Sequence, residues 1–131
     1  MSRDPDLEAD LRTSMARTWI HAYGEYQLPF MAAASRALRE SLPACPRCGA
    51  ALRAYFHVIN RNQSTGTIWV WCGSCDTQVH LPRVKPVRTF VDPFAALPKD
   101  EFIALETSRD EAFLDRLERM WNEGILRPST T

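Results

Sequence analysis

Long apolar runs are missing from this sequence: no stretch reaches the roughly 18 to 20 apolar residues that a membrane-spanning helix requires. Residues 1–6 are polar and lead into a charged periodic segment, which is not the pattern of a signal peptide. A net charge is missing as well, because 16 basic and 16 acidic residues cancel. The whole molecule therefore has no overall attraction to nucleic acid or to an anionic membrane. We expect a cytoplasmic protein without a membrane partner.

The sequence also lacks any motif that marks an active site. No Ser-His-Asp or Cys-His grouping surrounds His21, His57 or His80, and the carboxylates are spread along the chain rather than paired by a motif. We therefore expect a protein that is not an enzyme. An enzyme would need a pocket in which polar groups converge from separate parts of the chain, and a structure would have to show it.

The two ends of the chain carry helical patterns. In residues 4–43, apolar side chains recur at helical spacing, and Gly24 and Pro29 interrupt the pattern, which predicts two helices with the second beginning near Pro29. Residues 89–126 are predicted to be helical again, with a short helix or turn from Asp92 and Pro93 and another from Pro98 through Leu105. A capping-box pattern at 108–111 then predicts the start of a last helix, which a glycine closes at position 124.

The middle region, residues 44–88, has the composition of strands. Two runs of β-branched and aromatic residues, 55–59 and 68–71, are separated by turn-forming residues, which predicts a hairpin. A third short run follows at 77–81, and we expect Pro82 and Pro86 to stop the sheet. We therefore predict an α+β fold, with a three-stranded antiparallel sheet flanked by N-terminal and C-terminal helices, and a single domain over residues 1–131.

Two C-x-x-C pairs give the most specific signal in the chain. The pairs are Cys45 with Cys48 and Cys72 with Cys75, and 23 residues separate them. Four thiolates at tetrahedral corners suit zinc, and two residues between cysteines allow a tight knuckle turn that aims both sulfurs at one ion. Gly49 helps the first of these turns. The intervening hairpin is long enough to bring the second knuckle back to the first, so we predict one structural zinc ion.

This arrangement resembles the zinc-ribbon family over residues 44–81. The resemblance depends on the paired knuckles, Gly49 and the strands around them, and it departs at Asp76, where many ribbons have glycine. Disulfides are disfavoured because no secretory signal is present, and a redox dithiol would require a thioredoxin-like context that is absent. Iron in a four-cysteine site stays open as an alternative. A four-thiolate site has no open position for water, so we expect no catalysis at the metal.

The predicted ribbon is basic. Between Cys45 and Arg88 there are six basic residues and one acidic residue, whereas the flanking regions are acidic in balance. A basic ribbon with aromatic residues could hold phosphates and stack bases, and the candidate binding surface comprises Arg53, Arg61, Trp69 and Trp71. The competing interpretation, which we favour, is that the aromatic residues pack beneath the flanking helices while the arginines pair with acidic residues there.

Two functions are therefore carried forward. The first is a protein-binding module, motivated by the acidic residues of the segment 89–131 and the neutral total charge. Within the ribbon, residues 67–72, Thr-Ile-Trp-Val-Trp-Cys, resemble small bacterial proteins of toxin–immunity loci, which implies an immunity protein that masks a basic toxin. The second is a nucleic-acid-binding or transcription-associated ribbon, which predicts binding that weakens steeply with salt.

Overall fold

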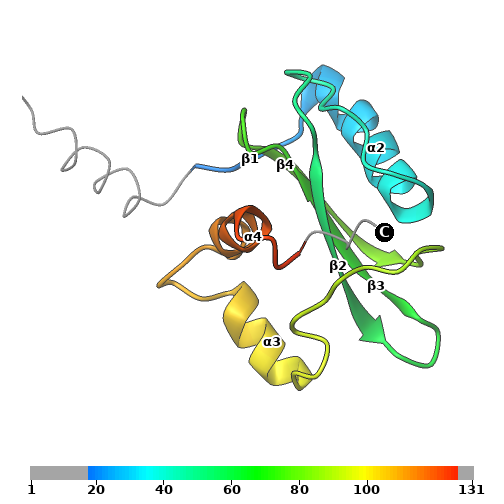
Figure 1. Cartoon of the computed structure of the whole chain (residues 1–131), viewed down its shortest axis with the longest axis vertical. Coiled ribbons are helices and arrows are strands. Elements are labelled where there is room, and N and C mark those ends of the chain that lie inside the picture. The colour runs from blue at the N-terminus through cyan, green and yellow to red at the C-terminus, as the bar shows by residue number, and fades with distance from the viewer. Residues whose placement is uncertain (1–17, 127–131) are drawn as a thin grey trace, which may run out of the picture.

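The computed structural model describes residues 18–126 and contains a mixed four-stranded sheet with helices on both of its faces (Figure 1). The sheet order is β1-β4-β3-β2. The strands β2, β3 and β4 are antiparallel neighbours, and β1 runs parallel to β4. In chain order the elements are β1 (Ile20–His21), the 3-10 helix η1 (Gly24–Tyr26), α2 (Gln27–Arg39), β2 (Arg53–Asn60), β3 (Thr65–Trp71), β4 (Thr77–Val84), α3 (Lys99–Glu106) and α4 (Phe113–Asn122).

The predicted hairpin is confirmed as β2 and β3. The side chain of Asn60 accepts hydrogen bonds from the backbone N–H groups of Asn62 and Gln63, at 3.1 and 3.2 Å, which fixes the start of the turn. The two strands approach closely at Gly66, where an added Cβ would lie 1.9 Å from the carbonyl oxygen of His57. Only glycine fits at that position of β3.

The third strand is longer than predicted. We expected Pro82 and Pro86 to stop the sheet, but β4 continues through Pro82 and ends at Val84, before Pro86. The pairing of β3 with β4 is irregular between Gly66 and Ile68, and Arg83 has a φ of 57° in the same stretch. A proline is tolerated here because it lies at an irregularity of the ladder, beyond the part of β4 that pairs with β1.

The N-terminal region differs most from prediction. Residues 4–17 of the predicted first helix lie outside the described residues, and Ile20–His21 form the strand β1 rather than a helix. The backbone N–H groups of Ile20 and Ala22 donate to the carbonyls of Asp76 and Gln78, both at 2.8 Å. The sheet is therefore four-stranded and mixed, not three-stranded and antiparallel. The second helix is confirmed as α2, which begins at Gln27, two residues before the predicted start.

Helices cover both faces of the sheet (Figure 1). Because side chains alternate along a strand, neighbouring residues of β2 and β3 enter different cores. One core lies under α2 and contains Phe30, Ala34, Phe56, Ile68 and Val70 among its buried residues. The other lies under α3 and α4 and contains Tyr55, Trp69, Trp71, Phe102, Phe113 and Leu117.

The segment between β4 and α3 joins these two sides across the edge strand β2. On the α2 side, the backbone N–H of Val87 donates to Leu38 and the guanidinium of Arg88 to Ala37. Further along, the ring of Phe90 packs on Phe56 at 5.7 Å. Asp92 then bonds to side chains on the opposite face of β2. We name residues 85–98 the strap, and it contacts side chains on both faces of the edge strand β2.

The two C-terminal helices follow the prediction in part. The helix α3 begins directly after Pro98, as expected. The predicted capping box is wrong: α4 has Ala112 at its N-cap, and the hydroxyl of Ser108 accepts instead from the backbone of Asp110. The end of α4 is confirmed at Gly124, which has a φ of 80°. Its N–H donates to the carbonyl of Trp121, and the next N–H donates to that of Met120, which is the pairing of a Schellman motif.

Candidate metal centre

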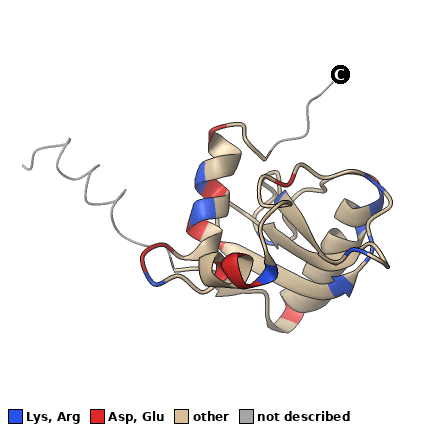
Figure 2. Ribbon diagram, turned by 90° about the horizontal axis from the view of Figure 1, so that it is seen from below, with Lys and Arg blue, Asp and Glu red and all other residues tan. Residues whose placement is uncertain are grey.

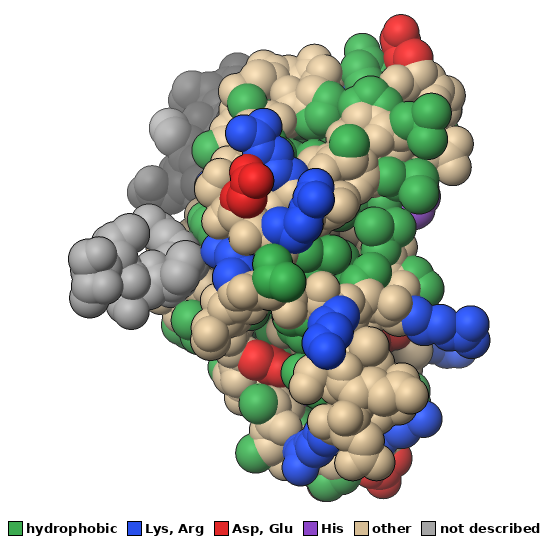
Figure 3. Space-filling view, turned by 90° about the vertical axis from the view of Figure 1, so that its right-hand side faces the viewer, with side chains coloured by type: hydrophobic (Ala, Val, Ile, Leu, Met, Phe, Trp, Pro, Cys, Tyr) green, Lys and Arg blue, Asp and Glu red, His purple; other side chains and the backbone are tan. Residues whose placement is uncertain are grey.

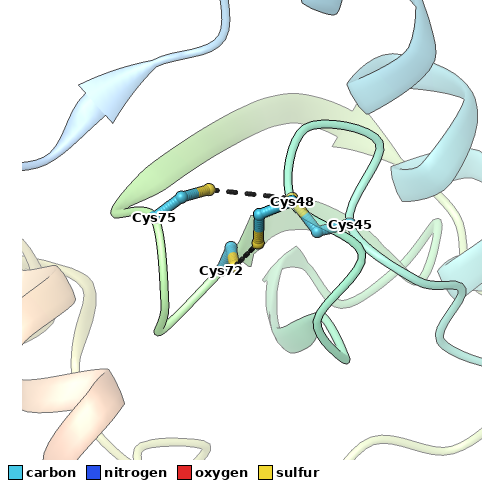
Figure 4. A group of neighbouring side chains, drawn as sticks. All are labelled: Cys45, Cys48, Cys72 and Cys75. Atoms are coloured by element: carbon cyan, nitrogen blue, oxygen red, sulfur yellow. Dashed lines mark hydrogen bonds between the residues drawn. The ribbon is translucent and has the colours of Figure 1, made fainter.

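The four cysteines lie at one end of the sheet, on the loops before β2 and after β3, and their side chains point toward one another (Figure 4). Their sulfurs all lie within 4.8 Å of one another. Cys45 and Cys72 are buried, Cys75 is half-buried and Cys48 is exposed. The two C-x-x-C pairs thus form a cluster with the composition and closeness of a metal site.

Both knuckles have the same backbone design. In each one, the N–H of the first cysteine donates to the carbonyl five residues later, and its carbonyl accepts from the N–H four residues later. These distances are 2.7 and 2.9 Å in the first knuckle and 2.9 and 3.1 Å in the second. The residue at the fourth position, Gly49 or Asp76, has a positive φ of 83° or 59°. Asp76 therefore adopts the conformation for which many ribbons use glycine.

The distances between sulfurs fit a shared ion better than a covalent bond. The Sγ atoms of Cys45 and Cys75 are 3.7 Å apart, and those of Cys48 and Cys72 are 3.3 Å apart. Tetrahedral zinc with bonds of about 2.3 Å places its sulfurs about 3.8 Å apart, whereas a disulfide bond is about 2.05 Å long. Each close pair combines one cysteine from each knuckle, so a bound ion would connect the two loops.

The protein environment opposes ionisation of the two buried thiols. Burial raises the pKa of Cys45, and it raises the pKa of Cys72 to about 12. Burial acts in the same direction on Cys75, but hydrogen bonds with Thr77 and the neighbouring thiols outweigh it and lower the pKa of Cys75 to about 7. A metal ion would supply the positive charge that stabilises four thiolates together.

Two residues outside the cysteine motif support the cluster. The side chain of Thr77 lies 3.3 Å from the sulfur of Cys75, and its hydroxyl accepts from Arg47 at 3.0 Å. The backbone N–H of Arg47 points at the sulfur of Cys45, at 3.4 Å. The sequence analysis did not identify Thr77. A hydroxyl two residues after a ligating cysteine, at the first position of a strand, is the signal that could have indicated it.

The residues of the candidate binding surface do not form one exposed patch. Trp69 and Trp71 are 4% and 0% exposed, because α3 and α4 cover them. Arg53 forms an ion pair with Glu118 of α4. Arg61 is exposed and lies apart, at the hairpin turn, where it donates to the carbonyl of Ala95. Neither tryptophan can stack on a base in this structure.

Comparisons with known proteins place the chain in no family. No family model matches it, and no curated protein or solved structure matches it either. Within residues 18–126, no helix is both long and apolar enough to cross a membrane. The candidate site must therefore be interpreted from its own geometry.

Proposed function

We propose that Cys45, Cys48, Cys72 and Cys75 bind one zinc ion and that the ion is structural. Four sulfurs that converge within 4.8 Å from two matched knuckles are the observation that supports this proposal. All four tetrahedral positions would be filled by protein ligands, so the ion would have no position for a substrate or a water. Iron could occupy the same ligand set, and it would be distinguished by its visible absorption.

The proposed ion would link the two knuckle loops at one end of the sheet. The first knuckle precedes β2 and the second follows β3, so the ion would tie together the open end of the hairpin. Cys45 and Cys72 also belong to the core under α2. Since two ligands are part of that core, loss of the ion would disturb the packing of α2 on the sheet. Metal binding and folding should therefore be coupled.

We further propose that the protein is a binding module for another protein and not an enzyme. Helices cover both faces of the sheet, so the surface left for a partner is formed largely by helices. Figure 2 shows acidic positions on α3 and mixed charges along α4. On α3, Asp100 and Glu101 are exposed beside the apolar side chain of Ile103, which is 47% exposed. An acidic surface with an apolar centre suits a basic protein partner.

A bacterial immunity protein is the concrete form of this proposal. In that case the surface of α3 would cover a basic region of a toxin, and neutralisation would depend on the acidic residues. Complementary charge of this kind accelerates association and selects the partner. The proposal requires that replacing the exposed acids weakens binding without lowering the stability of the protein.

Nucleic-acid binding is the second candidate, and the charge of the ribbon favours it. Arg47, Arg61, Arg83 and Lys85 are exposed. On the face that carries α2, however, basic side chains are separated by apolar and backbone surface (Figure 3). The aromatic residues that would stack bases are buried in the core under α3 and α4. A contact with nucleic acid would thus depend on phosphates alone, and it would weaken steeply with salt.

Site-specific photocrosslinking in cells separates these functions. A benzophenone amino acid replaces Glu101 on α3 in one version and Ser35, an exposed residue of α2, in a matched version. We expect a discrete protein adduct from position 101 and none from position 35, with the adduct lost when Asp100→Lys is added. Adducts with nucleic acid, or equal adducts from both positions, would contradict the protein-binding function.

A further inference from the structure

A cavity of about 430 Å³ opens between the hairpin, the end of the strap and α3, away from the cysteines. Its volume falls within the range of about 300 to 1,000 Å³ that is typical of small-molecule sites. The walls are largely apolar, with Val58, Pro98 and Ile103 among them. Six polar side chains converge on the same space: His57, Arg61, Thr67, His80, Lys99 and Glu106.

His57 is held rigidly in the wall of this cavity. It is 5% exposed, and its ring stacks on Phe102 with centroids 3.7 Å apart and planes 7° apart. Its Nδ1 lies 2.8 Å from a carboxylate oxygen of Asp92. The other oxygen of that carboxylate accepts from the hydroxyl of Tyr55 at 2.5 Å and from the backbone N–H of Phe94 at 2.9 Å. Because Asp92 acts only as an acceptor here, Nδ1 of His57 carries a proton.

The second ring nitrogen of His57 is therefore available to a ligand. In the neutral ring Nε2 is a hydrogen-bond acceptor, and it has no partner among residues 18–126. Nε2 of His57 is not fully buried either. Among residues 18–126, the fully buried side-chain nitrogen or oxygen that lacks a partner is Nε of Arg116, not this atom. An acceptor on a nearly buried side chain thus stays accessible from the cavity.

Glu106 provides a second unused acceptor in the same cavity. It is half-buried, and it has no hydrogen bond or ion pair with any described residue. Burial raises the pKa of Glu106, and it outweighs the opposite effect that a protonated His57 would have. Lys99 and Arg61 also line the cavity but are exposed. The acceptors thus lie on the more buried side and the cations lie at the mouth.

We propose that this cavity binds a small zwitterion of the amino-acid class with an apolar side chain. The ammonium group would donate to Nε2 of His57 and to the carboxylate of Glu106. The carboxylate would lie at the mouth near Lys99 and Arg61, and the apolar side chain would pack on the walls. This arrangement satisfies both unused acceptors and complements the two cations, which neither a simple amine nor a simple acid does.

His57 also has a structural role, because its bond to Asp92 holds the strap against β2. A purely structural histidine would give no saturable binding in the cavity. Three probes of similar shape separate the two roles: L-phenylalanine, phenethylamine without the carboxylate, and 3-phenylpropionate without the ammonium. Isotope-labelled full-length protein is titrated with each probe, and NMR shift changes give both the affinity and the location.

We expect saturable shifts around the cavity with L-phenylalanine, weaker binding of phenethylamine and the weakest binding of 3-phenylpropionate. Glu106→Gln should weaken L-phenylalanine binding about tenfold or more, because an ionised acceptor becomes neutral. His57→Gln should do the same, and His21→Gln, on an exposed histidine of β1, should leave the affinity unchanged. A cooperative melt of each variant shows that it is folded. Since Glu106 makes no hydrogen bond or ion pair with residues 18–126, its variant keeps the test decisive even if His57→Gln fails to fold.

The proposal is overturned if none of the probes binds at about 10 mM, a concentration at which even very weak ligands are detected. Tighter binding of 3-phenylpropionate than of phenethylamine would overturn it too, because that order would place an anion against Glu106. Binding that survives Glu106→Gln unchanged would likewise contradict the role given to the inner acceptors.

Discussion

Gly49 and Asp76 occupy the same position in the two knuckles, four residues after the first cysteine, and both have a positive φ. The N–H of each donates to the carbonyl of that first cysteine, at 2.9 and 3.1 Å. An L-residue pays for this conformation with a clash between its Cβ and the backbone, and aspartate is one of the few residues that adopt it regularly. The departure from glycine at Asp76 thus leaves the turn unchanged.

This equivalence predicts the effect of substitutions at the second knuckle. Asp76→Gly and Asp76→Ala both remove the carboxylate and differ only by a Cβ. We expect Asp76→Gly to be more stable than Asp76→Ala by about 1 kcal/mol, because alanine strains the left-handed backbone. Denaturant unfolding of the metal-loaded proteins measures the difference. Equal stabilities would mean that the φ of this residue is not constrained in solution.

Gly66 predicts a larger loss of stability from a different cause. A Cβ at this position would lie 1.9 Å from the carbonyl oxygen of His57, so the strands β2 and β3 would have to separate. We expect Gly66→Ala to lower the free energy of unfolding by about 2 kcal/mol or more. Gly124→Ala is the matched control, because nothing lies within 4 Å of its added Cβ and only the backbone strain remains. A smaller loss at Gly66 than at Gly124 would contradict the close approach of the strands.

The ion pair of Arg53 and Glu118 connects β2 to α4. The side chain of Glu118 is 8% exposed and that of Arg53 is 26% exposed, so the pair is largely shielded from water. We expect Glu118→Met alone to cost about 3 kcal/mol, because it removes the buried carboxylate that pairs with Arg53 and accepts from the indole N–H of Trp71. Adding Arg53→Met should restore part of that loss. A double-mutant cycle by denaturant unfolding measures the coupling, and additive losses would show that the pair does not stabilise the docking of α4.

His80 predicts a pH dependence. Burial lowers the pKa of His80 from 6.5, with a smaller contribution in the same direction from His21. The unfolded chain then binds a proton at pH values where the folded protein does not, so unfolding is favoured by acid. The stability that neutral His80 contributes is fully present above pH 6.5, the pKa of the unfolded chain. It is lost as the pH falls from there through the lower pKa of the folded protein.

Comparison with His80→Gln isolates this contribution. Acid also protonates the cysteines, but that effect is common to both proteins and cancels in the difference. We expect the wild type to lose more stability than the variant between about pH 7.5 and pH 5.5, as measured by chemical unfolding. Parallel pH profiles would show that the folded structure does not resist protonation of His80.

The features predicted from sequence are those encoded by neighbouring residues. The knuckles, the hairpin, the start of α3 after Pro98 and the closure of α4 at Gly124 all follow from local spacing and turn chemistry. The two-residue strand β1 could not be predicted, because it exists only through its pairing with β4. The capping box failed for a related reason: Glu111 pairs with arginines later in α4 instead of capping it.

The polar cavity was missed because its parts are far apart in the sequence. His57 of β2 and Glu106 of α3 lie far apart in the chain, and only the tertiary fold brings them to the same cavity. The aromatic residues of β3 were open to two interpretations for the same reason, since alternation along a strand does not show which face is covered. Trp69 and Trp71 are buried because α3 and α4 return to that face.

Metal content and thermal melting show whether the four cysteines hold a structural zinc ion. Native mass spectrometry of the purified chain counts bound zinc, and melting is then followed with and without a strong chelator. The account predicts about one zinc ion per chain, and it predicts that its removal lowers the melting temperature sharply, because Cys45 and Cys72 are part of the core under α2. A chain without metal, or a melt that the chelator does not change, would contradict a structural zinc site.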